Sequence, residues 1–305
     1  MTKRALVTGG YGFLGRYTAR ALAVAGFEVT AIGHGSWGRN EWRNWGITDW
    51  HLADVTLDTL VTYGRESDLV FHCAGSGSVP FSMTHPAQDF ERSVTTTLAV
   101  LEYVRLYATG TRVVFPSSAS VYGLAERMPI SVQDRLAPIS PYGVHKRIGE
   151  DLCRLYGKHF GVACAIVRLF SVYGVGLRKQ LLWDACGKIL NGDATFAGTG
   201  RETRDFIHVE DAAELLIHAA RKASVDCPTA NGGSGTRVSI AEIANEIALQ
   251  FGRKEGVVFS GIVRQGDPLH YQADITEALA WGWIPKRCWR DEVRAYARWY
   301  RGSAQ

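Results

Sequence analysis

Two side chains that can move a proton stand four residues apart in the segment YGVHK, which contains Tyr142 and Lys146. Positions i and i+4 share one face of a helix, so a helix here would place the phenol beside the ammonium. A free tyrosine has a pKa near ~10, and a nearby ammonium lowers it toward a range useful for acid–base work. The preceding segment FPSSASVYG offers serine hydroxyls that can hold a substrate oxygen. Because hydride transfer at a carbon requires proton transfer at its oxygen, these residues predict redox chemistry.

A glycine-rich segment, LVTGGYGFLG, lies between an apolar strand and an amphipathic helix near the N-terminus. Gly9, Gly12 and Gly15 permit a tight turn, close approach of a pyrophosphate and close packing of helix on strand. Gly10, Gly12 and Gly15 also fit the spacing G-x-G-x-x-G. The helix N-terminus offers free amides and a positive dipole to phosphate groups. The segment therefore predicts a nicotinamide dinucleotide site.

The residue that selects between NAD and NADP follows the second strand of such a site, and here it is Gly33 in EVTAIG. An Asp or Glu at this position bonds the ribose 2′-hydroxyl of NAD. This chain lacks that carboxylate and carries His34, Ser36 and Arg39 in the following loop. Their N–H and O–H groups could donate hydrogen bonds to a 2′-phosphate. We therefore expect a preference for NADP(H), with NAD as the alternative.

Short apolar segments alternate with longer amphipathic ones, which predicts a parallel sheet covered by helices on both faces. The expected strands are Arg4–Thr8, Glu28–Ile32, Asp68–Cys73, Arg112–Pro116 and Ala163–Leu169. The expected helices are Phe13–Ala25, Thr56–Tyr63, Ala87–Ala108, Tyr142–Phe160, Leu181–Leu190, Val209–Ala220, Ile240–Phe251 and Asp291–Tyr300. Ligands of such a sheet bind at the carboxyl ends of its strands.

We predict an α/β fold in two parts. Residues 1–172 are expected to form a Rossmann-type doubly wound parallel sheet that carries the dinucleotide site and the Ser-Tyr-Lys set. Residues 173–305 are expected to form mainly a smaller α+β substrate lobe, with residues 205–250 returning to the sheet. Four tryptophans, expected to pack beside or wall the adenosine site, are Trp37, Trp42, Trp45 and Trp50. Four more, expected in the core of the smaller lobe, are Trp281, Trp283, Trp289 and Trp299.

The composition argues against several classes of protein. Among 305 residues the net charge is +4, and the basic residues are scattered rather than gathered into the stripe of a nucleic-acid-binding protein. No apolar stretch is long enough to span a membrane, and the chain opens into a strand without a secretory leader. The six cysteines lack the spacing of metal ligands. We expect a cytoplasmic protein with no metal, nucleic-acid or membrane partner.

Further motifs follow in one order along the chain: TGGYGFLG, the pair DV, HCAG, SSASVYG, YGVHK, RLFSVYG, GTGRETRDFIHVED and NGGSG. This series resembles the extended branch of the short-chain dehydrogenase/reductase family, the group of nucleotide-sugar epimerases, dehydratases and ketoreductases. The resemblance implies that Ser118 holds the reacting oxygen, Tyr142 is the acid and base, and Lys146 binds the nicotinamide ribose. The expected cofactor contacts are Gly9, Gly12, Phe13, Leu14, Gly15, His34, Ser36, Arg39, Asp54, Val55, Ala74, Gly75, Tyr142, Lys146 and Phe170.

The same resemblance implies a nucleotide-diphosphate sugar as substrate. Arg204 and Arg264 are expected to bind its phosphates, because a guanidinium can bind phosphate oxygens in pairs, and Asp267 to lie near the nucleoside ribose. The other expected substrate contacts are Ser76, Ser118, Ser171 and Phe196. The family also implies a homodimer formed through helices near residues 87–108 and 142–160.

The chain departs from the family at positions that bear on the reaction. Ser93 and Ser171 replace two asparagines, of which the first normally shapes the helix beneath the active site. Ala119 and Ser120 replace the acid–base pair of the 4,6-dehydratases, and the decarboxylating relatives place a Glu at position 120, so both activities are disfavoured.

Two reactions then remain. The absent carboxylate at Gly33 favours NADPH-dependent reduction of a nucleotide-linked 4-keto-(6-deoxy)hexose. The alternative is a 4-epimerase of the UDP-glucose or UDP-N-acetylglucosamine type with tightly bound NAD. A second alternative is a non-catalytic NADP-binding sensor, although a sensor has no need of the complete Ser-Tyr-Lys set.

Overall fold

The central feature of the computed structural model, which describes residues 3–64, 67–262 and 270–303, is a parallel sheet in the order β10-β6-β5-β4-β1-β2-β3. Its strands are β1 Arg4–Thr8, β2 Glu28–Gly33, β3 Asp49–Leu52, β4 Leu69–His72, β5 Arg112–Ser118, β6 Cys164–Leu169 and β10 Thr229–Gly232. The direction of strand addition reverses at β1, between β2 and β4. Such a switch point opens a crevice at the carboxyl ends of the strands, which confirms the predicted doubly wound α/β fold.

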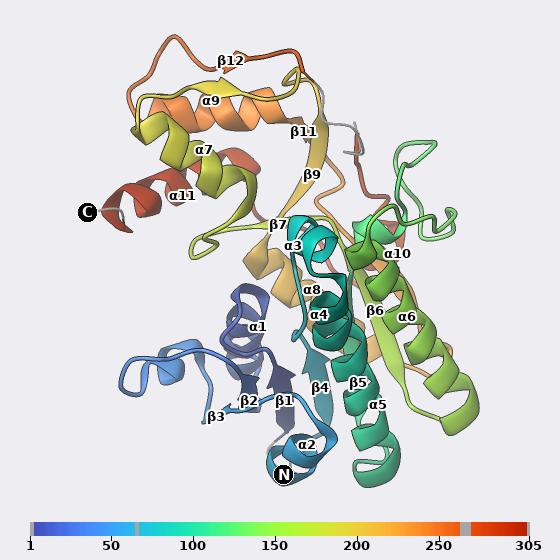
Figure 1. The fold of residues 1–305 in the computed structure, drawn as a ribbon. Helices are drawn as coiled ribbons and strands as arrows, with labels where there is room; N and C mark the ends of the chain where they lie inside the picture. Colours follow the sequence, from blue (N-terminus) through green and yellow to red (C-terminus); the bar gives the residue numbers. More distant parts are fainter. Residues whose placement is uncertain (1–2, 65–66, 263–269, 304–305) are drawn as a thin grey trace.

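Helices cover both faces of this sheet because successive strand residues point to opposite sides (Figure 1). Ala5 and Val7 of β1 pack into one core cluster, whereas Leu6 packs into another on the opposite face. The helices on the first face are α1 Phe13–Val24 and α8 Val209–Lys222; those on the second are α2 Leu57–Tyr63, α5 Thr96–Tyr107 and α6 Pro141–Phe160. The structure differs most from the predicted helices over residues 87–108.

That stretch divides into α4 Pro86–Phe90, a π-helical segment η2 Glu91–Thr95, and α5. The expectation of one uninterrupted helix was therefore wrong. A π turn releases backbone carbonyls from the regular α-helical bonds. Here hydroxyls bind two of those carbonyls, since Thr96 Oγ1 donates to Arg92 O over 2.7 Å and Thr97 Oγ1 to Ser93 O over 2.6 Å.

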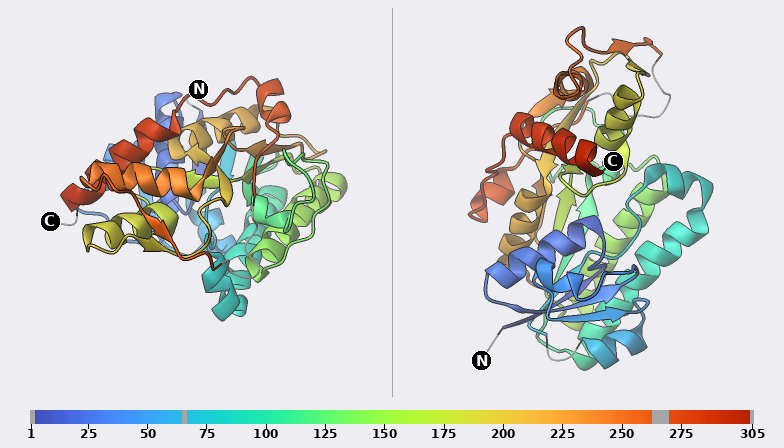
Figure 2. Two further views of the ribbon diagram at one scale, coloured as in Figure 1. Left: turned by 90° about the horizontal axis from the view of Figure 1, so that it is seen from above. Right: turned by 90° about the vertical axis from the view of Figure 1, so that its left-hand side faces the viewer.

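A smaller lobe lies over the carboxyl ends of the strands, as Figure 1 and the right-hand view of Figure 2 show. Its elements are β7 Ser171–Tyr173, α7 Gln180–Leu190, β8 Thr195–Phe196, β9 Thr203–His208, β11 Arg237–Ser239, α9 Ile240–Gln250, β12 Val258–Phe259 and α11 Trp289–Ser303. Short connecting elements are η1 Glu41–Trp45, α3 Val79–Thr84, η3 Ala119–Val121 and α10 Thr276–Ala280. Strands β7, β9 and β11 form a separate three-stranded sheet, and its β7 follows directly after β6. This connection places the lobe beside the crevice.

The tryptophans of the C-terminal quarter separate into two groups. Trp289 and Trp299 pack against the core of the smaller lobe, as predicted. Trp283, however, is buried in the core beneath the large sheet, with Trp281 packed against it. The prediction was wrong for these two because α10 returns the chain to α8, where Trp283 Nε1 donates to Asp211 O over 3.1 Å.

Within residues 3–64, 67–262 and 270–303, no helix is long and apolar enough to cross a membrane. In the same ranges, no group of three His, Cys, Asp or Glu side chains is arranged to hold a metal ion.

Candidate active site

Tyr142 lies in the first turn of α6, a helix that packs against β5. The helix begins there because Ser140 caps it, accepting from Gly143 N over 3.2 Å, and Pro141 occupies its first position. Burial raises the pKa of the Tyr142 phenol, a hydrogen bond with Ser118 lowers it, and the carboxylate of Asp89 raises it. The structure therefore brings Ser118 and Tyr142 together, and it is the serine that favours the phenolate.

Lys146 is buried one turn further along α6. Its Nζ donates to Pro116 O over 3.0 Å and lies 5.1 Å from the centre of the Phe115 ring. Burial lowers the pKa of Lys146 to about 8, opposed by the negative charges of neighbouring groups that include Asp89 and Glu150. The ammonium of Lys146 is thus bonded to Pro116, two residues before Ser118. Lys146 and Tyr142 share one face of α6.

The glycine loop fits the pyrophosphate of a dinucleotide. Gly9 has φ +70°, and a Cβ there would lie 2.7 Å from Ala74 N, so no other residue fits without displacement of backbone. A Cβ on Gly12 would meet Gly9 O at 3.0 Å, and Gly15 is also too close to Gly9 to carry one. Gly12 has no side chain to cap α1, which leaves the first amides of the helix available to phosphate oxygens.

The predicted ribose loop follows β2 as expected and is mostly exposed. Gly33 is buried, and a Cβ there would lie 3.3 Å from Gly9 Cα and 3.4 Å from the Trp50 ring. His34 Nε2 lies 2.7 Å from Asp54 Oδ1, so two predicted cofactor contacts pair with each other. Ser36 and Arg39 are exposed on the same loop.

Aromatic rings hold the first part of this loop on α1. Trp37 contacts Tyr11 and Trp50 edge-on, with ring centres 4.7 and 5.9 Å apart. The Arg16 guanidinium lies over the rings of Tyr11, Trp37 and Trp45 at 5.2 to 5.4 Å. These contacts agree with the expectation that Trp37, Trp45 and Trp50 pack, and Trp42 packs against the same core.

A buried histidine that the sequence analysis missed connects the glycine loop with the helices under the crevice. Burial, with the nearby charge of Lys146, lowers the pKa of His72 to about 3, so the ring is neutral. Thr97 Oγ1 already donates to a carbonyl, so it accepts from His72 Nε2 over 3.1 Å. Thr8 Oγ1 accepts from Ala74 N over 3.3 Å and donates to His72 Nδ1 over 2.8 Å. The chain of bonds fixes the tautomer and orders the backbone at Ala74.

The loop after β4 is hydrogen-bonded to Ser93. Ser76 N donates to Ser93 Oγ over 3.3 Å. Gly75, which lies between Ala74 and Ser76, has φ +131°. Ser93 belongs to the π-helical segment, so its hydroxyl connects that segment to the loop after β4.

A cavity of about 410 Å³ lies within the smaller lobe, and the predicted substrate residues Ser171, Phe196 and Arg204 line its wall. Phe196 is also part of the lobe's core. The sequence analysis missed polar lining residues on α7, namely Gln180, Asp184 and Lys188. Their spacing of four residues along an otherwise apolar helix, QLLWDACGKIL, was the signal that could have found them. The predicted Arg264 and Asp267 lie outside the described residues.

Four other predicted cofactor residues occupy packed positions. Phe13 and Leu14 open α1, and Phe13 contacts the Tyr17 ring with centres 5.6 Å apart. Val55 packs at the edge of the core on the α2 side. Phe170 is buried against the rings of Tyr122 and Tyr271.

Comparison with known proteins places this geometry in a family. The model of the NAD dependent epimerase/dehydratase family matches residues 5–230. The chain belongs to that family. It is 32% identical over 330 residues to a UDP-glucose 4-epimerase from Azospirillum brasilense, covering 99% of this chain and 93% of the relative. This epimerase/dehydratase family membership makes the chain an enzyme of an NAD-binding family and confirms the resemblance seen in its motifs.

Solved epimerase/dehydratase structures share the fold over the whole length. A UDP-N-acetylglucosamine 4-epimerase from Methanobrevibacter ruminantium, in complex with UDP-N-acetylmuramic acid, has a TM-score of 0.87 and 25% identity over 99% of both chains. A Thermus thermophilus UDP-glucose 4-epimerase in complex with NAD has a TM-score of 0.86 and 26% identity, covering 98% of this chain and 99% of that one.

Proposed function

We propose that the chain is an NAD-dependent 4-epimerase of a UDP-linked hexose. The observation that carries this proposal is the similarity, over nearly the full length of both chains, to proteins described as UDP-glucose and UDP-N-acetylglucosamine 4-epimerases. The comparisons favour epimerisation over the NADPH-dependent reduction that Gly33 alone suggested. Both reactions would use the same Ser118, Tyr142 and Lys146.

The chain's own residues account for the proton movements of epimerisation. Tyr142 as phenolate takes the proton from the sugar 4-hydroxyl and later returns it to the same oxygen, so one acid–base group serves both halves of the reaction. Inversion follows because the hydride is returned to the opposite face of C4. Ser118 donates a hydrogen bond to the oxygen while it is a carbonyl. Lys146 supplies the positive charge that stabilises the phenolate. Bound NAD would accept a hydride from the sugar carbon and give it back, with no net redox change.

The cavity beneath α7 is where we place the nucleotide diphosphate, with Arg204 as its principal cation. We expect Arg204→Gln to raise KM for the UDP-sugar roughly 10- to 100-fold and to change kcat little, because it removes charge-assisted hydrogen bonds to phosphate. Arg201→Gln is the matched control, since Arg201 is exposed in the same segment. Initial rates against UDP-sugar concentration measure both variants, and an unchanged KM in Arg204→Gln would remove Arg204 from the substrate site.

The cofactor provides the test of the whole proposal. Purified enzyme should release NAD on denaturation and should interconvert UDP-glucose and UDP-galactose, or the N-acetylated pair, without added cofactor. Activity that depends on added NADPH and a nucleotide-linked keto sugar would reject epimerisation in favour of the second candidate, the NADPH-dependent ketoreductase. The specific observation behind that candidate is the missing carboxylate at Gly33.

Gly33→Asp should shift the cofactor preference toward NAD. We expect the ratio of NADP to NAD affinity to fall at least about tenfold, because a carboxylate repels the 2′-phosphate. Gly33→Asn, which has the same shape without the charge, should leave this ratio closer to that of the wild type. Titration calorimetry on cofactor-stripped protein gives both affinities, and equal ratios in the two variants would show that charge at position 33 does not select the cofactor.

We also propose a homodimer, formed by α5 and α6 as the family resemblance implies. The outer faces of these helices leave Leu98, Leu106, Val144, Leu155 and Phe160 between 40% and 50% exposed. A second copy would cover this apolar face. Light scattering should therefore give twice the chain mass of 33.5 kDa.

A further inference from the structure

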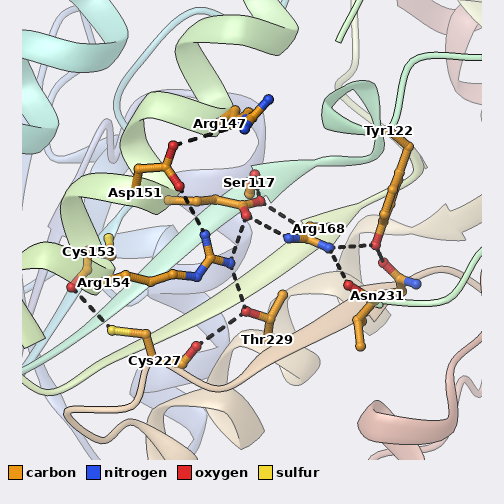
Figure 3. A network of polar contacts seen from close by, with 12 residues as sticks. Ser117, Tyr122, Arg147, Asp151, Cys153, Arg154, Arg168, Cys227, Thr229 and Asn231 are labelled. Carbon is orange, nitrogen blue, oxygen red and sulfur yellow. Dashed lines mark hydrogen bonds and ion pairs between the residues drawn. The ribbon is translucent and has the colours of Figure 1, made fainter. Parts of the chain in front are cut away.

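A buried ion pair joins α6 to β6 and contacts the end of β5 (Figure 3). Arg168 of β6 donates to Glu150 of α6 through Nε over 2.9 Å and through Nη2 over 2.8 Å. The relative exposure of Glu150 is 0% and that of Arg168 is 3%. Removing two charges from water costs about as much free energy as their attraction returns, so such a pair is a poor source of stability. Its contacts indicate another role.

The pair holds both ends of the short segment that contains Ser118. Ser117 Oγ donates to Glu150 Oε1 over 2.6 Å. At the other end, Arg168 Nη1 donates to the Tyr122 hydroxyl over 3.0 Å, and that hydroxyl donates to Asn231 Oδ1 over 2.6 Å (Figure 3). Every residue from 117 to 122 is thus confined between two anchors on one ion pair.

The same helix face carries the acid–base residue, the ammonium and this carboxylate. Tyr142, Lys146 and Glu150 are spaced four residues apart on α6. Lys146 binds the carbonyl of Pro116, and Glu150 binds the hydroxyl of the next residue, Ser117. These two bonds fix the position of β5 along α6, and therefore the position of Ser118 relative to Tyr142.

We propose that the Glu150–Arg168 pair is a positioning device that keeps Ser118 in hydrogen-bond contact with Tyr142, acting through Ser117 and Tyr122. This inference rests on the proposed function, in which Ser118 and Tyr142 are the reacting groups. Neither Glu150 nor Arg168 touches the substrate in this account. Their effect is on geometry, and a shift of about 1 Å at a reacting group can lower a rate by up to about 100-fold.

The electrostatics of Tyr142 provide a readout that a purely structural role would leave unchanged. The groups that act on its phenol are Ser118 from β5 and Asp89 from α4. On α6, the neighbouring His145 is bonded to Asp89 and Lys146 to Pro116 O. Among them, the Ser118 hydroxyl lowers the pKa of Tyr142 and Asp89 raises it. Displacement of Ser118 should therefore raise the pKa of Tyr142.

Ser117→Ala tests the inference most cleanly, because Glu150 keeps its two bonds from Arg168 and no charge is left unpaired. We expect kcat to fall roughly 10- to 100-fold with KM for the UDP-sugar within about twofold of wild type. The rising limb of the pH–rate profile should move to higher pH, and so should the tyrosinate absorbance titration, taken as a difference from Tyr142→Phe. Tyr122→Phe should show the same changes, and Ser117→Thr, which keeps the hydroxyl, should restore them.

Arg154→Gln is the matched control. Arg154 Nη2 binds Glu150 Oε2 over 3.0 Å from the half-exposed edge of the network, and it does not contact residues 117–122. This variant should keep the wild-type kcat and tyrosinate titration. If Ser117→Ala matches wild type in both readouts while Tyr142→Phe is inactive, the positioning role is refuted and the proposed function stands. If Tyr142→Phe is active, the proposed function itself fails. The tyrosinate titration decides the positioning role even if no tested UDP-sugar is turned over.

Discussion

Replacing Tyr142 by Phe is expected to lower kcat for UDP-sugar epimerisation by about 100- to 10,000-fold, the usual contribution of a positioned acid–base group. The change removes one oxygen, the atom that bonds with Ser118 and exchanges the proton of the sugar hydroxyl. KM should change little, because the cavity in which we place the nucleotide is lined by Arg204 and not by Tyr142. The measurement is the rate of interconversion of the two epimers, with substrate binding followed separately by calorimetry.

Tyr156→Phe is the control for this variant. Tyr156 lies near the C-terminal end of the same helix, and its hydroxyl donates to Glu102 of α5. It should retain the wild-type rate. A Tyr142→Phe enzyme with near-normal turnover would show that another group moves the proton, and the assignment of the active site would have to be abandoned.

The parts of the molecule that follow from local sequence were predictable. Strand β1 begins and ends at the predicted residues, Arg4 and Thr8, because its apolar run is bounded by a polar residue and a glycine turn. Helix α6 begins one residue before its predicted start, since Ser140 and Pro141 together specify a helix N-terminus. The glycine loop was equally readable, because its glycines are required by backbone contacts that no other residue allows.

What the sequence did not show depends on contacts between distant residues. Glu150 and Arg168 are separated by 18 positions, and only the packing of α6 on β6 makes them partners. An Arg inside the apolar run AIVRLF was a signal, although its partner could not be named from the run itself. The π-helical segment at Glu91–Thr95 and the return of Trp283 to the large sheet likewise depend on tertiary contacts that have no local signature.

The choice of reaction shows the limit of reading one residue. Position 33 carries Gly in place of the Asp or Glu that binds the NAD ribose, and this absence alone favoured NADPH and a reductase. The comparisons, which weigh the whole chain, favour NAD and a 4-epimerase instead. A single residue at position 33 changes one contact with the ribose 2′-hydroxyl or 2′-phosphate of the cofactor. The reaction depends on all residues of the site.

Replacing Lys146 by Met should lower kcat by about 100-fold or more, and its pH dependence would show why. Lys146 is the buried cation whose charge the carboxylates of Asp89 and Glu150 favour, and Asp89 also acts against the phenolate of Tyr142. Without the ammonium, the phenolate forms near the carboxylate of Asp89 with one positive charge fewer close by. The pKa of Tyr142 should therefore rise, and the rising limb of the pH–rate profile should move to higher pH.

The wild-type profile should also have an alkaline limb that the variant lacks. Burial lowers the pKa of Lys146 to about 8, so the ammonium is present below that pH and is lost as the pH rises through it. Activity that depends on the ammonium should then decline above pH 8 in the wild type, whereas Met has no proton to lose. Lys146→Arg should not restore activity, since the buried position holds one ammonium on Pro116 O and a planar guanidinium differs in shape and bonding. An alkaline limb that persists unchanged in Lys146→Met would assign it to a different group and leave Lys146 with a role in binding alone.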